Sequence, residues 1–180
     1  AFTDGAQFST GLNGEKTSRN AMSVVNLLWE DIFFWDARVN SMEEQALHPI
    51  QDPIEMDLTL GEAVDRLQSI RLYDSLFFHA YGDTLVTPER IAEALTDFQH
   101  SIISANSKYD QYLRGEADFT VREKLGLDLM RHPGEYWNDQ LGAYVFLRGG
   151  NCSDCHTVPL MNKLIGNQGV KNNGLSFENE

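Results

Sequence analysis

The stretch that decides the fold is Gly149-Gly150-Asn151-Cys152-Ser153-Asp154-Cys155-His156. It spells Cys-x-x-Cys-His and contains both cysteines of the chain. This spacing is typical of covalent attachment of a c-type haem, because two thiols must reach the two vinyl groups on one edge of the porphyrin. The residue that follows then places an imidazole nitrogen on the iron. We therefore expect thioether bonds at Cys152 and Cys155, and iron ligation by His156.

Two other uses of a Cys-x-x-Cys pair compete with haem attachment. A redox-active disulfide is expected near a βαβ pattern, and the sequence shows no such pattern. A structural zinc site needs four ligands, and the chain has no second cysteine pair to supply them. A lone histidine is more often structural than a ligand, but its place directly after Cys155 favours the iron.

Composition narrows the class of protein. The chain has 180 residues, enough for one domain or one and a half, and 14 basic against 27 acidic residues give a net charge of −13. This charge argues against nucleic acid and anionic membrane surfaces as partners. No apolar run has the length of a membrane span, and the first residues lack the pattern of a signal peptide. Because haem thioethers are formed outside the bacterial inner membrane, the motif predicts a periplasmic or exported protein.

Helical patterns dominate the chain, and we predict an all-α fold of short helices with long loops, as in cytochrome c-like haem domains. Three Ser/Thr-x-x-Glu sequences are typical of capping boxes, and Thr87-Pro88 indicates the start of a helix. Apolar residues recur at helical spacing in most of the remaining segments. We expect helices at about 21–32, 42–47, 60–77, 88–102, 121–130 and 136–147. Residues 1–20 and 115–119 are expected to be loops, and residues 106–110 are expected to lead out of the helix before them.

Some of these helices also predict buried faces. Ile91, Leu95, Phe98 and Ile102 form one apolar stripe, and Leu125 and Leu129 form another. Prolines in the stretch 48–53 are expected to end the helix that begins after Ser41.

Several further stretches, taken in order, resemble one family, the bacterial di-haem cytochrome c peroxidases with their MauG-like relatives. No single stretch besides the haem motif is decisive, and their shared order makes the match specific. The stretches are Phe2-Thr3-Asp4-Gly5, Arg19-Asn20-Ala21-Met22-Ser23, Phe34-Trp35-Asp36-Ala37-Arg38, Glu43-Glu44-Gln45-Ala46, Pro53-Ile54-Glu55-Met56 and Ser104-Ala105-Asn106-Ser107-Lys108-Tyr109-Asp110.

The resemblance implies two cytochrome c-like domains, each with its own Cys-x-x-Cys-His. Residues 1–118 would be part of the N-terminal, peroxidatic domain, whose haem motif would precede Phe2. Residues 119–180 would begin the C-terminal, electron-transfer domain. The chain would then be a piece of a larger enzyme with two haem c groups, at most one of them attached through this chain, and this piece alone would be inactive.

The resemblance also implies roles for four other residues. Glu55 would move a proton on the distal side of the N-terminal haem, and Gln45 would orient peroxide there. Trp35 would lie between the haems, and Asn20 would contribute to a calcium site between the domains. On the residues alone, Gln45 and Glu55 could be plain surface and Trp35 a core aromatic. One asparagine is by itself a poor calcium signature.

One position departs from the family pattern. Many members carry a histidine in a Ser-x-Gly-His loop that ligates the resting N-terminal haem, whereas this chain has Ser9-Thr10-Gly11-Leu12. A leucine cannot ligate iron. If the alignment holds, the N-terminal haem has an open sixth position and needs no reductive activation.

Two alternative functions remain open beside the reduction of peroxide. The resemblance implies reduction of hydrogen peroxide to water with electrons from a small donor such as a cytochrome c or a cupredoxin. A mono-haem electron-transfer cytochrome is the non-catalytic alternative, and a MauG-like oxidase of a protein or another substrate is the catalytic one. A second copy of the chain, as a homodimer, is a candidate partner.

Overall fold

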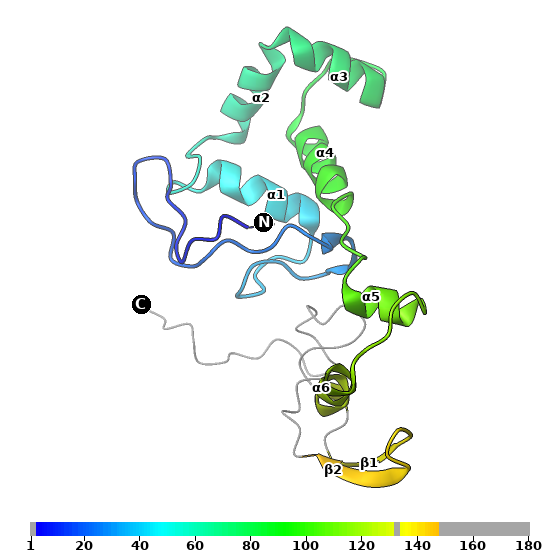
Figure 1. Cartoon of the computed structure of the whole chain (residues 1–180). Coiled ribbons are helices and arrows are strands. Elements are labelled where there is room, and N and C mark those ends of the chain that lie inside the picture. The colour runs from blue at the N-terminus through cyan, green and yellow to red at the C-terminus, as the bar shows by residue number, and fades with distance from the viewer. Residues whose placement is uncertain (1–2, 132–133, 148–180) are drawn as a thin grey trace. The chain divides into compact units, whose positions relative to one another are not determined.

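The computed structural model describes residues 3–131 and 134–147, and nearly all of its regular structure is helical (Figure 1). The predicted all-α class is confirmed, with one short hairpin as the only sheet among the described residues. The elements in chain order are η1 (Leu27–Trp29), α1 (Met42–Gln51), α2 (Leu60–Gln68), α3 (Arg71–Tyr81), α4 (Pro88–His100), α5 (Lys108–Leu113), α6 (Val121–Arg131), β1 (Gly134–Asn138) and β2 (Ala143–Leu147).

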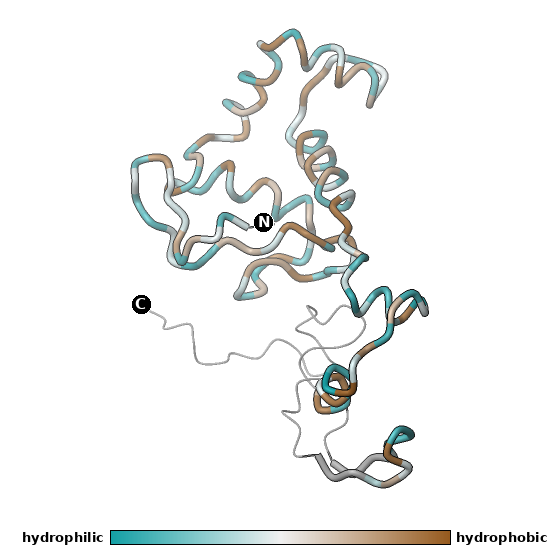
Figure 2. The backbone as a smooth tube through the Cα atoms, viewed as in Figure 1, coloured by the Kyte–Doolittle hydropathy of each residue, from teal (hydrophilic) through white to brown (hydrophobic). Residues whose placement is uncertain are grey.

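The chain divides into two compact units, residues 1–104 and 105–180, and each is described by itself. The predicted domain boundary after residue 118 stays a prediction. Figure 2 shows apolar residues spread in short segments along the helices, with polar residues between them. Within the described part of the chain, no helix combines the length and apolarity needed to cross a membrane.

The core of the first unit lies where α1 packs on α4 and α2 packs on both α1 and α3. A second, smaller cluster joins the start of α1 to the loop before it, through Phe33, Val39 and Met42. Burial of these side chains fixes that loop against the helix. The buried residues of the main cluster are Ile50, Ala63, Phe77, Val86 and Ile91.

Three predicted helix starts are confirmed in atomic detail. The Thr59 hydroxyl accepts the backbone N–H of Glu62 at 3.2 Å, and the Glu62 carboxylate accepts the Thr59 N–H at 2.8 Å, which completes a capping box. Thr87 caps α4 ahead of Pro88. The Thr120 hydroxyl accepts the N–H of Glu123 in the same way.

The expected stripe on α4 is only partly buried. Ile91 is in the core, but the side chains that accompany it are Ala92 and Thr96, whereas Leu95 is 37% and Phe98 64% exposed. In the second unit Leu125, predicted to be buried, is 40% exposed.

The prediction that α1 ends near Leu47 was wrong, because the helix continues to Gln51 with Pro49 inside it. A proline in a last turn loses one intrahelical bond. Here the loss is offset by burial of Ile50 and by the Asp52 N–H, which donates to the His48 carbonyl at 2.9 Å. The expected reciprocal bond from Glu44 to Ser41 is also replaced, since the Ser41 hydroxyl donates to Glu43 at 2.6 Å.

The predicted helix over 21–32 was also wrong, and only the single turn η1 forms. Asn26 explains the difference. It takes the left-handed conformation at φ 62°, and its side chain accepts the N–H of Ser104 at 2.8 Å and donates to the Ser104 carbonyl at 3.1 Å. An asparagine bonded to a distant backbone in this way competes with helix formation.

The third error is the helix expected at 136–147, where the chain forms the antiparallel hairpin β1–β2. The Asn138 side chain accepts the N–H groups of Gln140 and Leu141, both at 3.0 Å, and so closes the turn. Trp137 pairs across the strands with Tyr144, at 5.2 Å between ring centroids. Helix α5 was not predicted, and a Ser107–Asp110 capping box begins it.

Candidate functional site

The loop before α1 presents Trp35 as part of a tight reversal. The backbone N–H of Phe33 donates to the carbonyl of Val39 at 2.8 Å, and the Ala37 N–H donates to the Phe34 carbonyl at 3.0 Å. Phe34 and Ala37 both adopt positive φ, 65° and 59°. This reversal places Trp35 and Asp36 at its tip, and Trp35 is 49% exposed.

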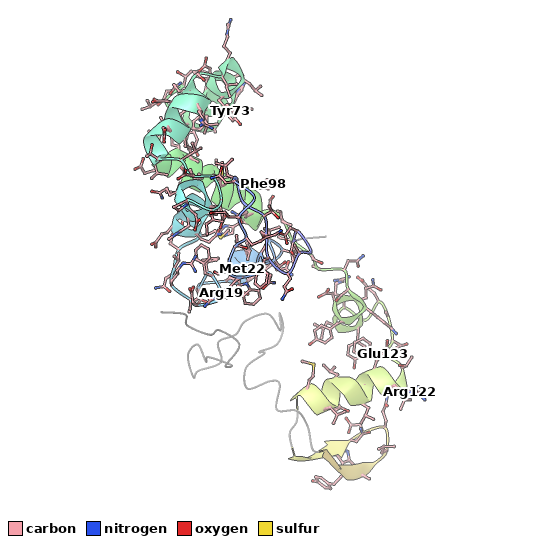
Figure 3. All side chains as sticks on the ribbon, turned by 90° about the vertical axis from the view of Figure 1, so that its left-hand side faces the viewer. Arg19, Met22, Tyr73, Phe98, Arg122 and Glu123 are labelled. Atoms are coloured by element: carbon pink, nitrogen blue, oxygen red, sulfur yellow. The ribbon has the colours of Figure 1, made fainter. Side chains whose placement is uncertain are left out.

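Two consecutive side chains at this tip are bound to two consecutive residues of the N-terminal segment. The indole Nε1 of Trp35 donates to the carbonyl of Asn20 at 2.9 Å. The Asp36 carboxylate pairs with Arg19 at 3.2 Å, and Figure 3 shows Arg19 in this segment, at the opposite end of the first unit from Tyr73 of α3. These paired contacts orient the indole ring.

The segment after α1 folds back on the helix and carries Glu55. The Met56 N–H donates to the Pro49 carbonyl at 3.2 Å, and the Leu58 N–H donates to the Ile50 carbonyl at 2.9 Å. Within the segment, the Glu55 N–H donates to the Asp52 carbonyl at 3.1 Å. Glu55 is thereby fixed near the C-terminal end of α1, the helix that also carries Gln45.

Gln45 is half-buried on α1, and its amide makes no hydrogen bond to any of the described residues. Its donor and acceptor are therefore available to a ligand. The structure gives no direct contact between Gln45 and Glu55, so a joint action of the two side chains stays a prediction.

Burial and the neighbouring charges shift the pKa of Glu55 in opposing directions. Desolvation by the surrounding protein raises the pKa of this carboxyl, and the negative charge of Asp52 raises it further. The positive charges of Arg38 and His48 oppose that rise in pKa. The side chain still reaches solvent. A carboxyl with a raised pKa that remains accessible is suited to proton transfer.

The loop that departs from the family pattern lies against this same segment. Gly11 approaches Ile54 so closely that a Cβ added to Gly11 would lie 1.7 Å from the Ile54 carbonyl oxygen. The backbone N–H of Leu12 donates to that oxygen at 3.0 Å. The contact requires a glycine at position 11, because no side chain fits there. The Leu12 side chain is 64% exposed.

These observations fit a haem beside Glu55. Leu12, Trp35 and Met56 are large apolar side chains that are 64%, 49% and 49% exposed, and they come from segments joined by the hydrogen bonds described above. A flat apolar cofactor would remove such surface from water. An amide on Gln45 and a carboxyl on Glu55 supply the polar groups that a peroxide would need.

The other predicted ligands stay predictions. Cys152, Cys155 and His156 lie outside the described residues. The side chain of Asn20 makes one long contact, 3.5 Å to the Ala21 carbonyl. No cluster of three or more His, Cys, Asp or Glu side chains is placed to hold a metal ion within 3–131 and 134–147. Calcium at Asn20 stays a prediction.

Sequence reasoning missed three residues that the structure puts at this site, namely Gly11, Arg38 and His48. The sequence did offer a signal for Arg38, since this residue follows the aromatic run Phe33–Trp35 and lies two residues after an aspartate. His48 carries no signal of its own in the sequence, and in the structure its charge acts on Glu55. Nothing in the sequence pairs Gly11 with Ile54.

Comparison with known proteins identifies the class of protein to which the chain belongs. The family model for di-haem cytochrome c peroxidases matches residues 1–118. The chain therefore belongs to the di-haem cytochrome c peroxidase family, which includes MauG.

Individual relatives come from both branches of the family. The chain is 33% identical over 157 residues to the methylamine utilization protein MauG of Methylophilus methylotrophus, with 87% of this chain and 43% of that protein covered. It is 30% identical to the cytochrome c551 peroxidase of Nitrosomonas europaea, with coverage of 87% and 42%. The chain thus spans about two fifths of the length of these relatives.

Solved structures support the fold. A MauG-like protein associated with microbial copper homeostasis matches with a TM-score of 0.62 at 33% identity, over 72% of this chain and 39% of that one. The di-haem peroxidase BthA from Burkholderia thailandensis matches with a TM-score of 0.65 over 87% of this chain and 40% of that one, at 24% identity.

Proposed function

We propose that this chain is part of a di-haem peroxidase that reduces hydrogen peroxide to water with electrons from a small redox protein. The observation that carries the proposal is Glu55, an accessible carboxyl with a raised pKa, held by the turn that follows the helix of Gln45. Haem, when bound, would supply the iron that accepts peroxide and the electrons for cleavage of the O–O bond.

The chain's own residues supply proton movement and orientation. As a carboxylate, Glu55 takes the proton from one peroxide oxygen and returns it to the other, so that the departing oxygen leaves as water. Gln45 donates its amide N–H to, or accepts from, the bound peroxide and holds it in line. Trp35, oriented by Asn20, assists electron transfer between the haems.

The remaining parts of the proposal concern the whole protein. Residues 1–118 belong to the peroxidatic domain, and residues 119–180 begin the electron-transfer domain, with haem attached at Cys152 and Cys155 and ligated by His156. Asn20 contributes to a calcium site between the domains. The protein works in the periplasm or is exported, and its acidic surface suits a basic electron donor such as a small cytochrome c or a cupredoxin.

Leu12 extends the proposal to the resting state. The Gly11–Leu12 loop is fixed to Ile54 by its backbone and offers no ligand, so peroxide reaches the oxidised enzyme without prior reduction. A low-spin, six-coordinate N-terminal haem in the oxidised whole protein would refute this part.

A second function has support from the relatives named MauG. In that case the site would oxidise a protein or another substrate after reacting with peroxide. The two functions are separated by product analysis: the peroxidase consumes peroxide in proportion to oxidised donor, whereas the oxidase leaves a modified substrate.

The test of the proposed function uses the whole protein loaded with haem. Denatured absorbance with intact mass should give two covalent haems, and one haem would point instead to an electron-transfer cytochrome. Glu55→Gln should slow the peroxide reaction by about 100-fold or more, which is the usual contribution of a positioned acid–base group. Unchanged peroxide turnover in Glu55→Gln would contradict the role of this carboxyl.

A further inference from the structure

The side chain of Arg38 is fixed on two sides. Its Nη1 contacts both carboxylate oxygens of Asp36, at 2.8 and 3.0 Å. Its guanidinium carbon lies 3.5 Å from the centroid of the Phe34 ring, a close cation–π contact. An arginine held by a carboxylate and an aromatic face loses much of its rotamer freedom, so its charge has a defined position.

The Phe34 ring connects this cation to α1. The Phe34 ring also contacts the imidazole of His48, with ring centroids 5.2 Å apart and an edge-to-face angle of 76°. His48 lies three residues after Gln45, so the two share one side of the helix. Arg38, Phe34 and His48 therefore form one packed group beside the turn that carries Glu55.

The charges around Glu55 come from three elements. Asp52, in the same turn, disfavours ionisation of Glu55, and Arg38 and His48 favour it. Asp36 is bound by Arg19 and Arg38. On the N-terminal loop that packs against Ile54, the charged Lys16 is hydrogen-bonded to Thr10. Of the two cations, Arg38 lowers the pKa of Glu55 more than His48 does.

We propose that Arg38 is a positioning residue that keeps Glu55 ionised, and so able to accept the first proton from peroxide. This inference rests on the proposed function. The reaction needs a carboxylate at its start, since a neutral carboxylic acid has no free proton-accepting charge. Overall, hydrogen peroxide takes up two electrons from the donor protein and two protons, the O–O bond breaks, and two waters form. Arg38 opposes the burial and the Asp52 charge, both of which raise the pKa of Glu55.

The experiment uses the whole haem-loaded protein with Arg38→Gln and a matched control, Arg19→Gln. Both substitutions remove one positive charge and one ion pair to Asp36, but only Arg38 acts on Glu55. In Arg38→Gln the acidic limb of the pH profile of the peroxide reaction should move upward by about half a pH unit. Arg19→Gln should leave that limb in place, and Arg38→Lys should restore it in large part.

A second readout does not depend on turnover. The carboxyl stretching band of Glu55, assigned by its loss in Glu55→Gln, is titrated by infrared difference spectroscopy in the oxidised protein without peroxide. Its midpoint should rise in Arg38→Gln and fall in Asp52→Asn, which keeps the oxygen that accepts the Ile54 N–H at 2.8 Å. Opposite shifts in these two variants support the inference even if Arg38→Gln binds haem poorly.

The outcomes separate the inference from the function on which it rests. If Glu55→Gln reacts with peroxide as fast as the wild type, the proposed role of Glu55 fails. If Glu55→Gln is slow but neither Arg38→Gln nor Asp52→Asn moves the Glu55 midpoint, the role of Arg38 is overturned while the peroxidase proposal stands. An equal shift in Arg19→Gln would also overturn it, because the effect would then be one of net charge.

Discussion

The backbone N–H of Leu12 donates a 3.0 Å hydrogen bond to the carbonyl oxygen of Ile54, the residue directly before Glu55. This bond joins the N-terminal loop to the turn that carries the proposed proton-transfer group. It uses only backbone atoms, so it does not depend on the leucine side chain. The position at which the family pattern has a histidine is therefore held close to Glu55, whatever residue occupies it.

Gly11→Ala should break this junction. The new Cβ would lie 1.7 Å from the Ile54 carbonyl oxygen and 2.7 Å from its carbon, so the two segments must separate. We expect a loss of about 2 kcal/mol in stability and a slower peroxide reaction, because Glu55 moves with Ile54. Thermal unfolding and stopped-flow kinetics measure the two effects.

The control for that substitution is Gly14→Ala in the same loop. Gly14 has a positive φ of 80°, and no heavy atom lies within 4 Å of an added Cβ at this position. It should cost about 1 kcal/mol through backbone strain, with peroxide kinetics unchanged. Equal kinetic effects from both alanines would show that loop strain, and not the contact with Ile54, matters.

Leu12→His should restore a ligand where the family pattern has one. The side chain at this position is 64% exposed, so a histidine can be accommodated without repacking a core. We expect a low-spin signal from the N-terminal haem of the oxidised protein and a peroxide reaction that requires prior reduction. Electron paramagnetic resonance and absorption spectra follow the change, and a high-spin spectrum identical to the wild type would count against the assigned position of Leu12.

The sequence predicted helix starts well because capping is local. Thr59 and Glu62 satisfy each other's backbone partners within one turn, and no distant residue is needed. Two of its errors arose where a distant group decides the local structure. The predicted helix does not form at Asn26 because the amide of this residue binds the backbone of Ser104, 78 residues away in sequence. Helix α1 continues through Pro49 because Ile50 is buried in the core.

The candidate site shows the same division. Gln45, Glu55 and Trp35 were named only through the resemblance of their motifs to those of the family. The influence of Arg38 on Glu55 could not, because it arises from the loop reversal at Phe33–Val39 and from the stack on Phe34. Residues that tune a site through space leave little trace in a local pattern.

Trp35→Phe tests the contact that orients the indole. The substitution keeps an aromatic ring but removes Nε1, so the Asn20 carbonyl loses its 2.9 Å donor. Because this hydrogen bond is exposed, its loss should cost only about 0.5 kcal/mol. Electron transfer between the haems, followed after rapid reduction, should nevertheless slow clearly. The control is Trp29→Phe, at a tryptophan that is 43% exposed in η1, and it should leave that rate unchanged.

Asp83→Asn should reveal a part of the acid stability of the first unit. Arg90 contacts both carboxylate oxygens of Asp83, the longer contact being 3.0 Å, and the Leu85 N–H donates to the same carboxylate at 2.9 Å. These bonds lower the pKa of Asp83 from 3.8 to about 2 in the folded protein. The folded state therefore binds the proton more weakly than the unfolded state, and the interaction stabilises the protein above pH 3.8. That stabilisation is lost as the pH falls from 3.8 toward 2.

The melting temperature of Asp83→Asn should lie below that of the wild type at pH 6, and the difference between the two melting temperatures should close between pH 4 and pH 2. Asp65→Asn is the control, since Asp65 makes no ion pair with any described residue. It should show no such closing gap, and a pH-independent gap in Asp83→Asn would mean that its carboxylate charge does not stabilise the fold.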